Sequence, residues 1–189
     1  MGASLIYVVG ASGSGKDALM RHARVRLASD PGVVFAHRYI TRPHDAGGEN
    51  HVALTPQEFE ARRTAGLFAM YWESHGHHYG IGIEINQWLA KGVTVVVNGS
   101  REYLPAARMR YHELVPVWIE VSPEVLRQRL LARGRETAAE IERRLARHRA
   151  LQGRADTRGE AIRNDGALEE AGEGLVALIR RYRRETACA

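Results

Sequence analysis

The chain has 189 residues, of which 44% are hydrophobic and 26% are charged, with one cysteine and a formal net charge of +5. This size and balance are typical of one globular domain, and they exclude a membrane-embedded protein and a small disulfide-stapled one. We therefore expect a single domain over residues 1–189 with no membrane partner. No basic stretch followed by an apolar run of signal-peptide length is found near the N-terminus, so a cytoplasmic location is expected.

The basic residues are almost all arginines, because Lys16 and Lys91 are the only lysines among 27 basic residues. The planar guanidinium group binds phosphate through two parallel hydrogen bonds. A basic run over 180–184 is compatible with nucleic-acid binding, but cations are also favoured at the C-terminal end of a helix. We favour the helix end, and expect small phosphorylated molecules rather than nucleic acid as partners.

Short β-branched runs alternate with helical segments along the chain. Strands of a parallel sheet, buried on both faces, are predicted over 5–9, 33–36, 93–97 and 117–121. Helices are predicted over about 16–28, after Thr55, from Ser122 to about 133, after Thr137, and over about 168–184. This alternation predicts an α/β fold with right-handed crossovers.

A glycine-rich turn joins the first predicted strand to the first predicted helix. It matches the pattern G-x-x-x-x-G-K, in which backbone N–H groups surround phosphates and the lysine reaches the terminal phosphate groups. Glycine is needed because the backbone must approach the anion closely, and the following helix presents its positive end. The predicted nucleotide-binding residues are Gly10, Ala11, Ser12, Gly13, Ser14, Gly15, Lys16 and Asp17.

One position of this loop departs from the usual pattern. Asp17 stands where serine or threonine normally supplies a hydroxyl to Mg²⁺. A carboxylate is also a hard oxygen ligand, although it adds a negative charge beside the nucleotide. We expect Asp17 to stay ionised and to position Mg²⁺, either directly or through water.

Over nearly its whole length the chain resembles the guanylate kinase group of P-loop kinases. The matching segments are the phosphate loop, the Tyr39-Ile-Thr-Arg-Pro43 segment, the His75-Gly-His-His-Tyr-Gly80 segment, arginine-bearing stretches after Arg133 and Ile141, and the Asn164-Asp165 pair. The resemblance implies a three-layer α/β/α P-loop kinase fold with a mostly parallel sheet. It also implies an acceptor-binding insertion over 36–82 and an arginine-bearing lid over 133–150.

The positions that read guanine in that group are different here. Arg38 replaces the expected serine and Met70 replaces the expected glutamate. The second acceptor arginine is missing, with His44 and Asp45 nearby, and His51 stands at the position of a phosphate-binding tyrosine. Replacing a carboxylate by methionine and a hydroxyl by arginine favours an anion over a base edge. A second phosphate is therefore expected in this place.

The chain also resembles the ribose 1,5-bisphosphate phosphokinases, a family linked to phosphonate breakdown. The segments that carry this resemblance are 36–42, 97–101, 121–124 and 127–130. It implies a phosphotransferase that uses ATP and Mg²⁺ to phosphorylate a phosphate group, giving 5-phosphoribosyl 1-diphosphate and ADP. The substrate-binding residues expected from it are Arg38, Arg42, His51, Tyr79, Asn98 and Arg101. The expected catalytic residues are Lys16, Arg133 and Arg144, with Arg135 and Arg147 as further candidates in the lid.

Other interpretations of these features stay open. A nucleoside monophosphate kinase with altered base preference, or a guanylate-kinase-like interaction module without catalysis, would share much of the pattern. Most arginines between Arg127 and Arg149 fit a solvated helix face with i, i+4 ion pairs, and His75, His77 and His78 lack the spacing of a structural zinc site. The sequence does not fix the oligomeric state, and a homodimer stays open.

Overall fold

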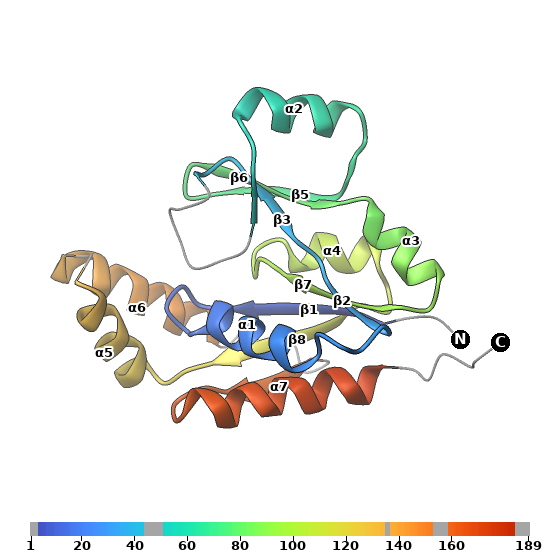
Figure 1. Ribbon diagram of the computed structural model, residues 1–189. Helices are drawn as coiled ribbons and strands as arrows, with labels where there is room; N and C mark the ends of the chain where they lie inside the picture. Colours follow the sequence, from blue (N-terminus) through green and yellow to red (C-terminus); the bar gives the residue numbers. More distant parts are fainter. Residues whose placement is uncertain (1–3, 44–50, 135–136, 153–158, 184–189) are drawn as a thin grey trace.

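The computed structural model describes residues 4–43, 51–134, 137–152 and 159–183; the side chains of residues 133, 147, 148, 151 and 152 also lie outside the description. Its centre is a five-stranded parallel sheet in the order β2-β7-β1-β8-β9 (Figure 1). The strands are β1 (Leu5–Gly10), β2 (Val33–Phe35), β7 (Thr94–Asn98), β8 (Val115–Glu120) and β9 (Glu160–Arg163). The four predicted strands and their parallel arrangement are confirmed, and β9 was not predicted.

Helices cover both faces of this sheet. Below it in Figure 1 lie α1 (Lys16–Arg26) and α7 (Leu168–Tyr182), and above it lie α3 (Glu84–Ala90) and α4 (Leu104–Arg110). Two separate clusters of buried side chains fill the two interfaces, one centred on Ile6, Leu19 and Leu175 and the other on Tyr7, Val97 and Leu104. The three-layer α/β/α prediction is confirmed. Only Val33 is buried in β2, because β2 is an edge strand.

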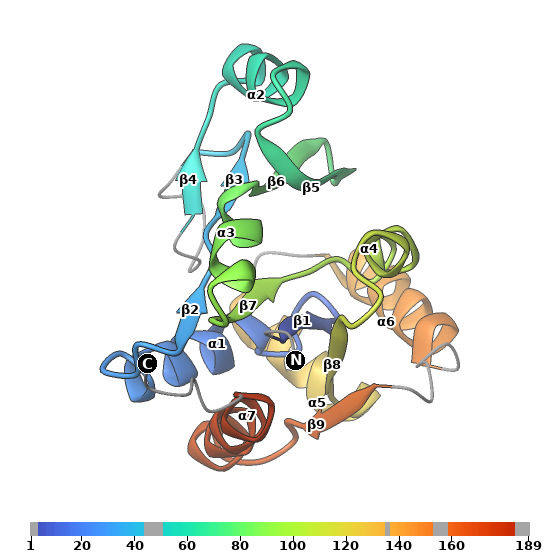
Figure 2. The same ribbon diagram turned by 90° about the vertical axis from the view of Figure 1, so that its right-hand side faces the viewer.

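A second, four-stranded sheet stands on the α3–α4 side of the first (Figure 2). Its order is β4-β3-β6-β5, with β4 (His51–Ala53), β3 (Arg38–Ile40), β6 (His77–Gly82) and β5 (Phe68–Ser74). The helix α2 (Pro56–Thr64) packs on its outer face through Phe59 and Phe68, whose rings stack with centroids 4.6 Å apart. This sheet occupies the region predicted as the acceptor-binding insertion.

Two further helices lie at the carboxyl ends of the central strands. The helix α5 (Pro123–Arg133) and the helix α6 (Ala138–Gln152) pack together around Leu126, Leu130 and Leu145. Ser122 caps α5, and Thr137 forms the predicted capping box with Glu140 at the start of α6. Within the described part of the chain, no helix has the length and apolar character needed to span a lipid bilayer.

Candidate active site

The glycine-rich turn lies between the end of β1 and the start of α1, as predicted. Gly13 and Gly15 have φ angles of 95° and 84°, in the left-handed region that disfavours residues with a Cβ. The N–H of Ser14 donates to the carbonyl of Ala11 at 3.0 Å, which closes the turn. Lys16 begins α1, so the positive end of that helix meets the turn.

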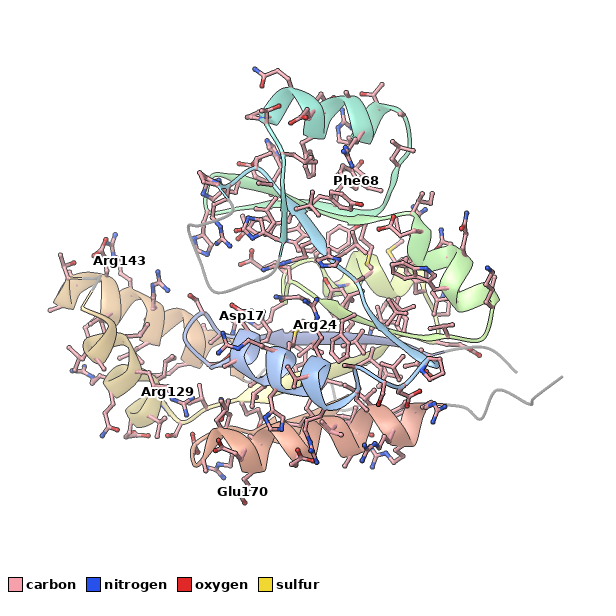
Figure 3. The ribbon with its side chains drawn as sticks, in the orientation of Figure 1. Asp17, Arg24, Phe68, Arg129, Arg143 and Glu170 are labelled. Carbon is pink, nitrogen blue, oxygen red and sulfur yellow. The ribbon has the colours of Figure 1, made fainter. Side chains whose placement is uncertain are left out.

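Two side chains hold the turn from outside it. Asn164, which is buried just after β9, donates from Nδ2 to the carbonyl oxygen of Ser14 at 2.6 Å. Arg129 of α5 donates from Nη1 to the same oxygen at 3.3 Å, and Figure 3 shows this residue on the α5 side of the turn. Asn164 and Arg129 both lie in segments that carry the family resemblance, but neither was predicted to hold the loop. Neither contact has a sequence signal, because each joins segments more than 100 residues apart.

Three side chains form a closed triangle at the end of the turn. The Lys16 ammonium group is 2.9 Å from Asp17 Oδ1 and also donates to Asn98 Oδ1. Asn98, the buried last residue of β7, donates from Nδ2 to Asp17 Oδ1 at 3.0 Å. Asn98 thus contacts the phosphate loop, a contact that the prediction of a substrate-binding role did not anticipate.

The charge of Lys16 is the main reason that the pKa of Asp17 is lowered, to about 2. The hydrogen bonds from Lys16 and Asn98 and the positive charge of Arg38 act in the same direction, whereas burial opposes them. Asp17 is therefore ionised throughout the neutral range, as predicted.

A lid arginine reaches the same loop from the other side. Arg144 of α6 donates from Nη1 to the Ser12 hydroxyl at 2.6 Å, which spans 132 residues of chain. An ion pair between Arg127 and Glu142 joins α5 to α6 and so helps to fix this helix. The side chains of Arg133 and Arg147, and the whole of Arg135, His44 and Asp45, lie outside the described residues. Their predicted roles stay predictions.

The second sheet places Arg38, Met70 and Tyr79 on one face. In the strand register Arg38 is opposite Ile81, which is opposite Met70, so all three side chains lie in one row on the same face. The next row contains Tyr79 and Trp72. Met70 and Ile81 are fully buried in the cluster that this sheet shares with the central one. Arg38 and Met70, the two positions at which the residues that recognise guanine are replaced, therefore lie in one row on the same face of the sheet.

Aromatic rings and a guanidinium group are stacked along this face. The Arg38 guanidinium carbon is 5.0 Å from the centre of the Tyr79 ring. Tyr79 stacks on Trp72 with centroids 5.6 Å apart and planes at 4°, and Trp72 stacks on Tyr103 at 5.4 Å. Tyr103 precedes α4, so the stack connects the second sheet to the loop after β7. It holds Arg38 and Tyr79 in place.

Arg42 and His51 lie together beside this row. The Nε atom of Arg42 is buried and has no hydrogen-bond partner among the described residues. His51 donates from Nε2 to the backbone carbonyl of Arg42 at 3.2 Å. Because an unpartnered buried donor is costly, the arrangement favours an anion at Arg42.

The loop that carries Arg101 is fixed by a buried tyrosine. The Tyr7 hydroxyl accepts from the N–H of Ser100 at 2.9 Å and donates to the carbonyl of Ser100 at 3.1 Å. A Cβ at Gly99 would overlap the Tyr7 ring, so glycine is required there. Burial raises the pKa of Tyr7 well above its usual value, and the hydroxyl therefore stays protonated. This contact holds the backbone between Asn98 and Arg101.

Comparisons with known proteins identify relatives of the chain. No protein-family model matches the chain. Proteins named ribose 1,5-bisphosphate phosphokinase PhnN are similar to it: that of Thiobacillus denitrificans is 62% identical over 93% of this chain and 92% of the relative. Those of Desulfomicrobium baculatum and Chromobacterium violaceum are 58% and 53% identical, covering 93% and 96% of this chain and the same shares of the relatives.

The fold has a solved counterpart in guanylate kinase from Anaplasma phagocytophilum. That structure matches 98% of this chain and 88% of its own with a TM-score of 0.69, at 18% sequence identity. At that identity the likeness shows the fold alone, which is guanylate-kinase-like, while the relatives that share more than half of their residues with this chain show the family. The chain is thus a phosphotransferase that belongs to the ribose 1,5-bisphosphate phosphokinase PhnN family.

Proposed function

We propose that the chain transfers the γ-phosphoryl group of ATP to the 1-phosphate of ribose 1,5-bisphosphate, giving 5-phosphoribosyl 1-diphosphate and ADP. The observation that carries the choice of acceptor is Arg38, whose guanidinium carbon lies 5.0 Å from the centre of the Tyr79 ring, in the same row of the sheet as Met70. The guanidinium group of Arg38 is a cation held in place on this face, and it is suited to bind the second phosphate of the acceptor. The name shared by the relatives supports the same acceptor.

The reaction needs charge and alignment rather than a general base. An oxygen of the 1-phosphate attacks the γ-phosphorus, the bond from that phosphorus to the β-bridging oxygen breaks, and ADP leaves with the electron pair. The second pKa of a phosphate monoester is about 6, so the attacking oxygen is already ionised at neutral pH. The protein must bring two polyanions together and offset the charge on the transferred group.

The residues divide this work between the two substrates. The phosphate loop and Lys16 hold the ATP phosphates, and Arg144, which already reaches Ser12, neutralises charge on the transferred group. Arg42, Tyr79 and His51 hold the accepting 1-phosphate. Arg38 and Arg101 hold the 5-phosphate. Arg133 joins the lid arginines in this proposal on the family resemblance alone.

Magnesium is proposed as the metal that accompanies ATP. The Asp17 carboxylate is a hard oxygen donor of the kind that Mg²⁺ prefers, and Asn98 donates a hydrogen bond to it, so the residues present fit the metal. Among the described residues no group of three or more His, Cys, Asp and Glu side chains forms a metal cage. This agrees with a metal held partly by substrate phosphates. When bound, it would add positive charge at the β- and γ-phosphates.

A nucleoside monophosphate fits this face less well. Met70 is fully buried and offers no donor or acceptor to a base edge, while the neighbouring Arg38 adds a positive charge. An interaction module without catalysis would have no need of Lys16 and of Arg144 at the phosphate loop. A cytoplasmic location, a homodimer and the absence of nucleic-acid partners stay predictions.

The acceptor is tested by coupled measurement of ADP release with ribose 1,5-bisphosphate, GMP, dGMP and AMP. We expect kcat/KM for ribose 1,5-bisphosphate to exceed that for each nucleotide by at least about a hundredfold, because a nucleotide leaves Arg38 without its anion. Release without any acceptor measures background ATP hydrolysis. A preference for GMP would overturn the proposal.

The pH dependence of kcat/KM for the acceptor is expected to follow the substrate rather than the enzyme. Protonation of the acceptor phosphate removes the attacking charge, so activity should fall on the acid side of about pH 6. Asp17, whose pKa is about 2, stays ionised over this range. Rate profiles between pH 5 and 9 for the native chain and for Asp17→Asn should show the same acid midpoint. A midpoint that moves in the variant would contradict this assignment.

A further inference from the structure

The triangle at the end of the phosphate loop is held together by Asn98. Its amide oxygen accepts from Lys16 and its amide nitrogen donates to Asp17, while Lys16 and Asp17 also contact each other. The asparagine is buried at the end of a central strand, so its side chain has little freedom. Asp17 by contrast is half-exposed at the first turn of α1. The buried Asn98 side chain thus orients the half-exposed Asp17 side chain.

An amide is suited to this position because it donates and accepts at once. Aspartate at position 98 would accept from Lys16 but would stand against the Asp17 carboxylate as a second negative charge. Alanine would leave Asp17 without its fixed donor. The pair therefore combines one carboxylate, that of Asp17 at the start of α1, with one neutral amide, that of Asn98 at the end of β7.

We propose that Asn98 is a positioning residue that aims the Asp17 carboxylate at the metal–nucleotide complex, and that the two positions act as a reciprocal pair in which only one carries a carboxylate. The proposal rests on the proposed nucleotide site and does not depend on which acceptor is phosphorylated.

The test is a cycle of variants read by metal binding. The affinity for Mn²⁺ is measured by electron paramagnetic resonance with a saturating non-hydrolysable ATP analogue and no acceptor. Asn98→Ala and Asp17→Ser are each expected to weaken Mn²⁺ binding by about tenfold or more, as loss of a supporting contact at a metal site typically does, and Asn98→Asp alone completes the cycle. The double variant Asp17→Ser/Asn98→Asp restores one carboxylate and one hydroxyl, and is expected to return within about threefold of the native affinity.

Asn86→Ala is the matched control. Asn86 is a half-buried asparagine on α3 whose Oδ1 accepts from the Tyr111 hydroxyl at 2.7 Å, so its replacement also removes an asparagine hydrogen bond. It should leave Mn²⁺ affinity unchanged, and thermal melting without ligands checks that every variant is folded. The proposal is overturned if Asn98→Ala binds Mn²⁺ as tightly as the native chain does, or if the double variant binds Mn²⁺ no more tightly than Asp17→Ser.

If the acceptor assignment were wrong, this cycle would still give the same result, since no acceptor is present. Conversely, the double variant could fail to recover Mn²⁺ affinity while the native chain strongly prefers ribose 1,5-bisphosphate as acceptor. That result would overturn the pairing of Asp17 with Asn98 and leave the proposed function intact. The two proposals therefore fail separately.

Discussion

Arg144→Ala is expected to lower kcat by about 10³-fold, the effect typical of removing an arginine that stabilises a transferred phosphoryl group. The side chain crosses from α6 to the Ser12 hydroxyl at 2.6 Å, so it already reaches the loop that is proposed to hold the nucleotide phosphates. The KM for ATP should change by less than about threefold, since the charge offset by Arg144 develops chiefly in the transition state. Steady-state kinetics with varied ATP and a saturating acceptor measure both constants.

Arg143→Ala is the control for this variant. Arg143 is the preceding residue of the same helix and is exposed, and Figure 3 shows it on α6. The substitution removes the same charge from the same helix and should leave kcat within about twofold, because surface charges of this kind contribute little. An unchanged kcat in Arg144→Ala, or an equal loss in both variants, would exclude Arg144 from the transition-state contacts.

Gly15→Ala is expected to lower kcat/KM for ATP by about a hundredfold or more. The φ of Gly15 is 84°, a conformation that costs an alanine about 1–2 kcal/mol. An added Cβ would also overlap Asn164 Nδ2, which holds the Ser14 carbonyl. The loop must therefore shift, and a displacement of about 1 Å is enough to cost about 10²-fold in rate. Initial rates at low ATP concentration measure the loss.

Gly174→Ala separates this effect from that of the added methyl group. Gly174 lies within α7, and a Cβ there would meet nothing within 4 Å. Alanine should raise the free energy of unfolding by about 0.5–1 kcal/mol in urea denaturation, because glycine is unfavourable inside a helix. Its kinetic constants should match those of the native chain. If Gly15→Ala retained native activity, the described geometry of the loop would be wrong.

The sequence was sufficient for features that depend on local patterns. Buried β-branched runs predicted β1 and β7, and the capping residues Thr55, Ser122 and Thr137 predicted where three helices begin. The glycine turn between β1 and α1 was predicted for the same reason, since its spacing has a direct backbone meaning. The resemblance to known kinases then gave the fold and the family.

Features that depend on distant segments were not predicted. The strand β9 is short and has one buried residue, Ile162, so its sequence has no strong strand signal. Arg129 and Asn164 meet at the Ser14 carbonyl only because α5 and the end of β9 are brought together by the fold. The contact of Asn98 with Asp17 was not predicted, because it crosses 81 residues of the chain. Tertiary packing, rather than local preference, decides these positions.

A crystal structure with ADP and ribose 1,5-bisphosphate would show whether the acceptor face holds a sugar with two phosphates. We expect the 1-phosphate against Arg42 and Tyr79, and the 5-phosphate within hydrogen-bond distance of Arg38. A parallel crystal with GMP in place of the bisphosphate should show no ordered base. Arg38 turned to solvent, with a nucleobase ordered beside Met70, would contradict the account.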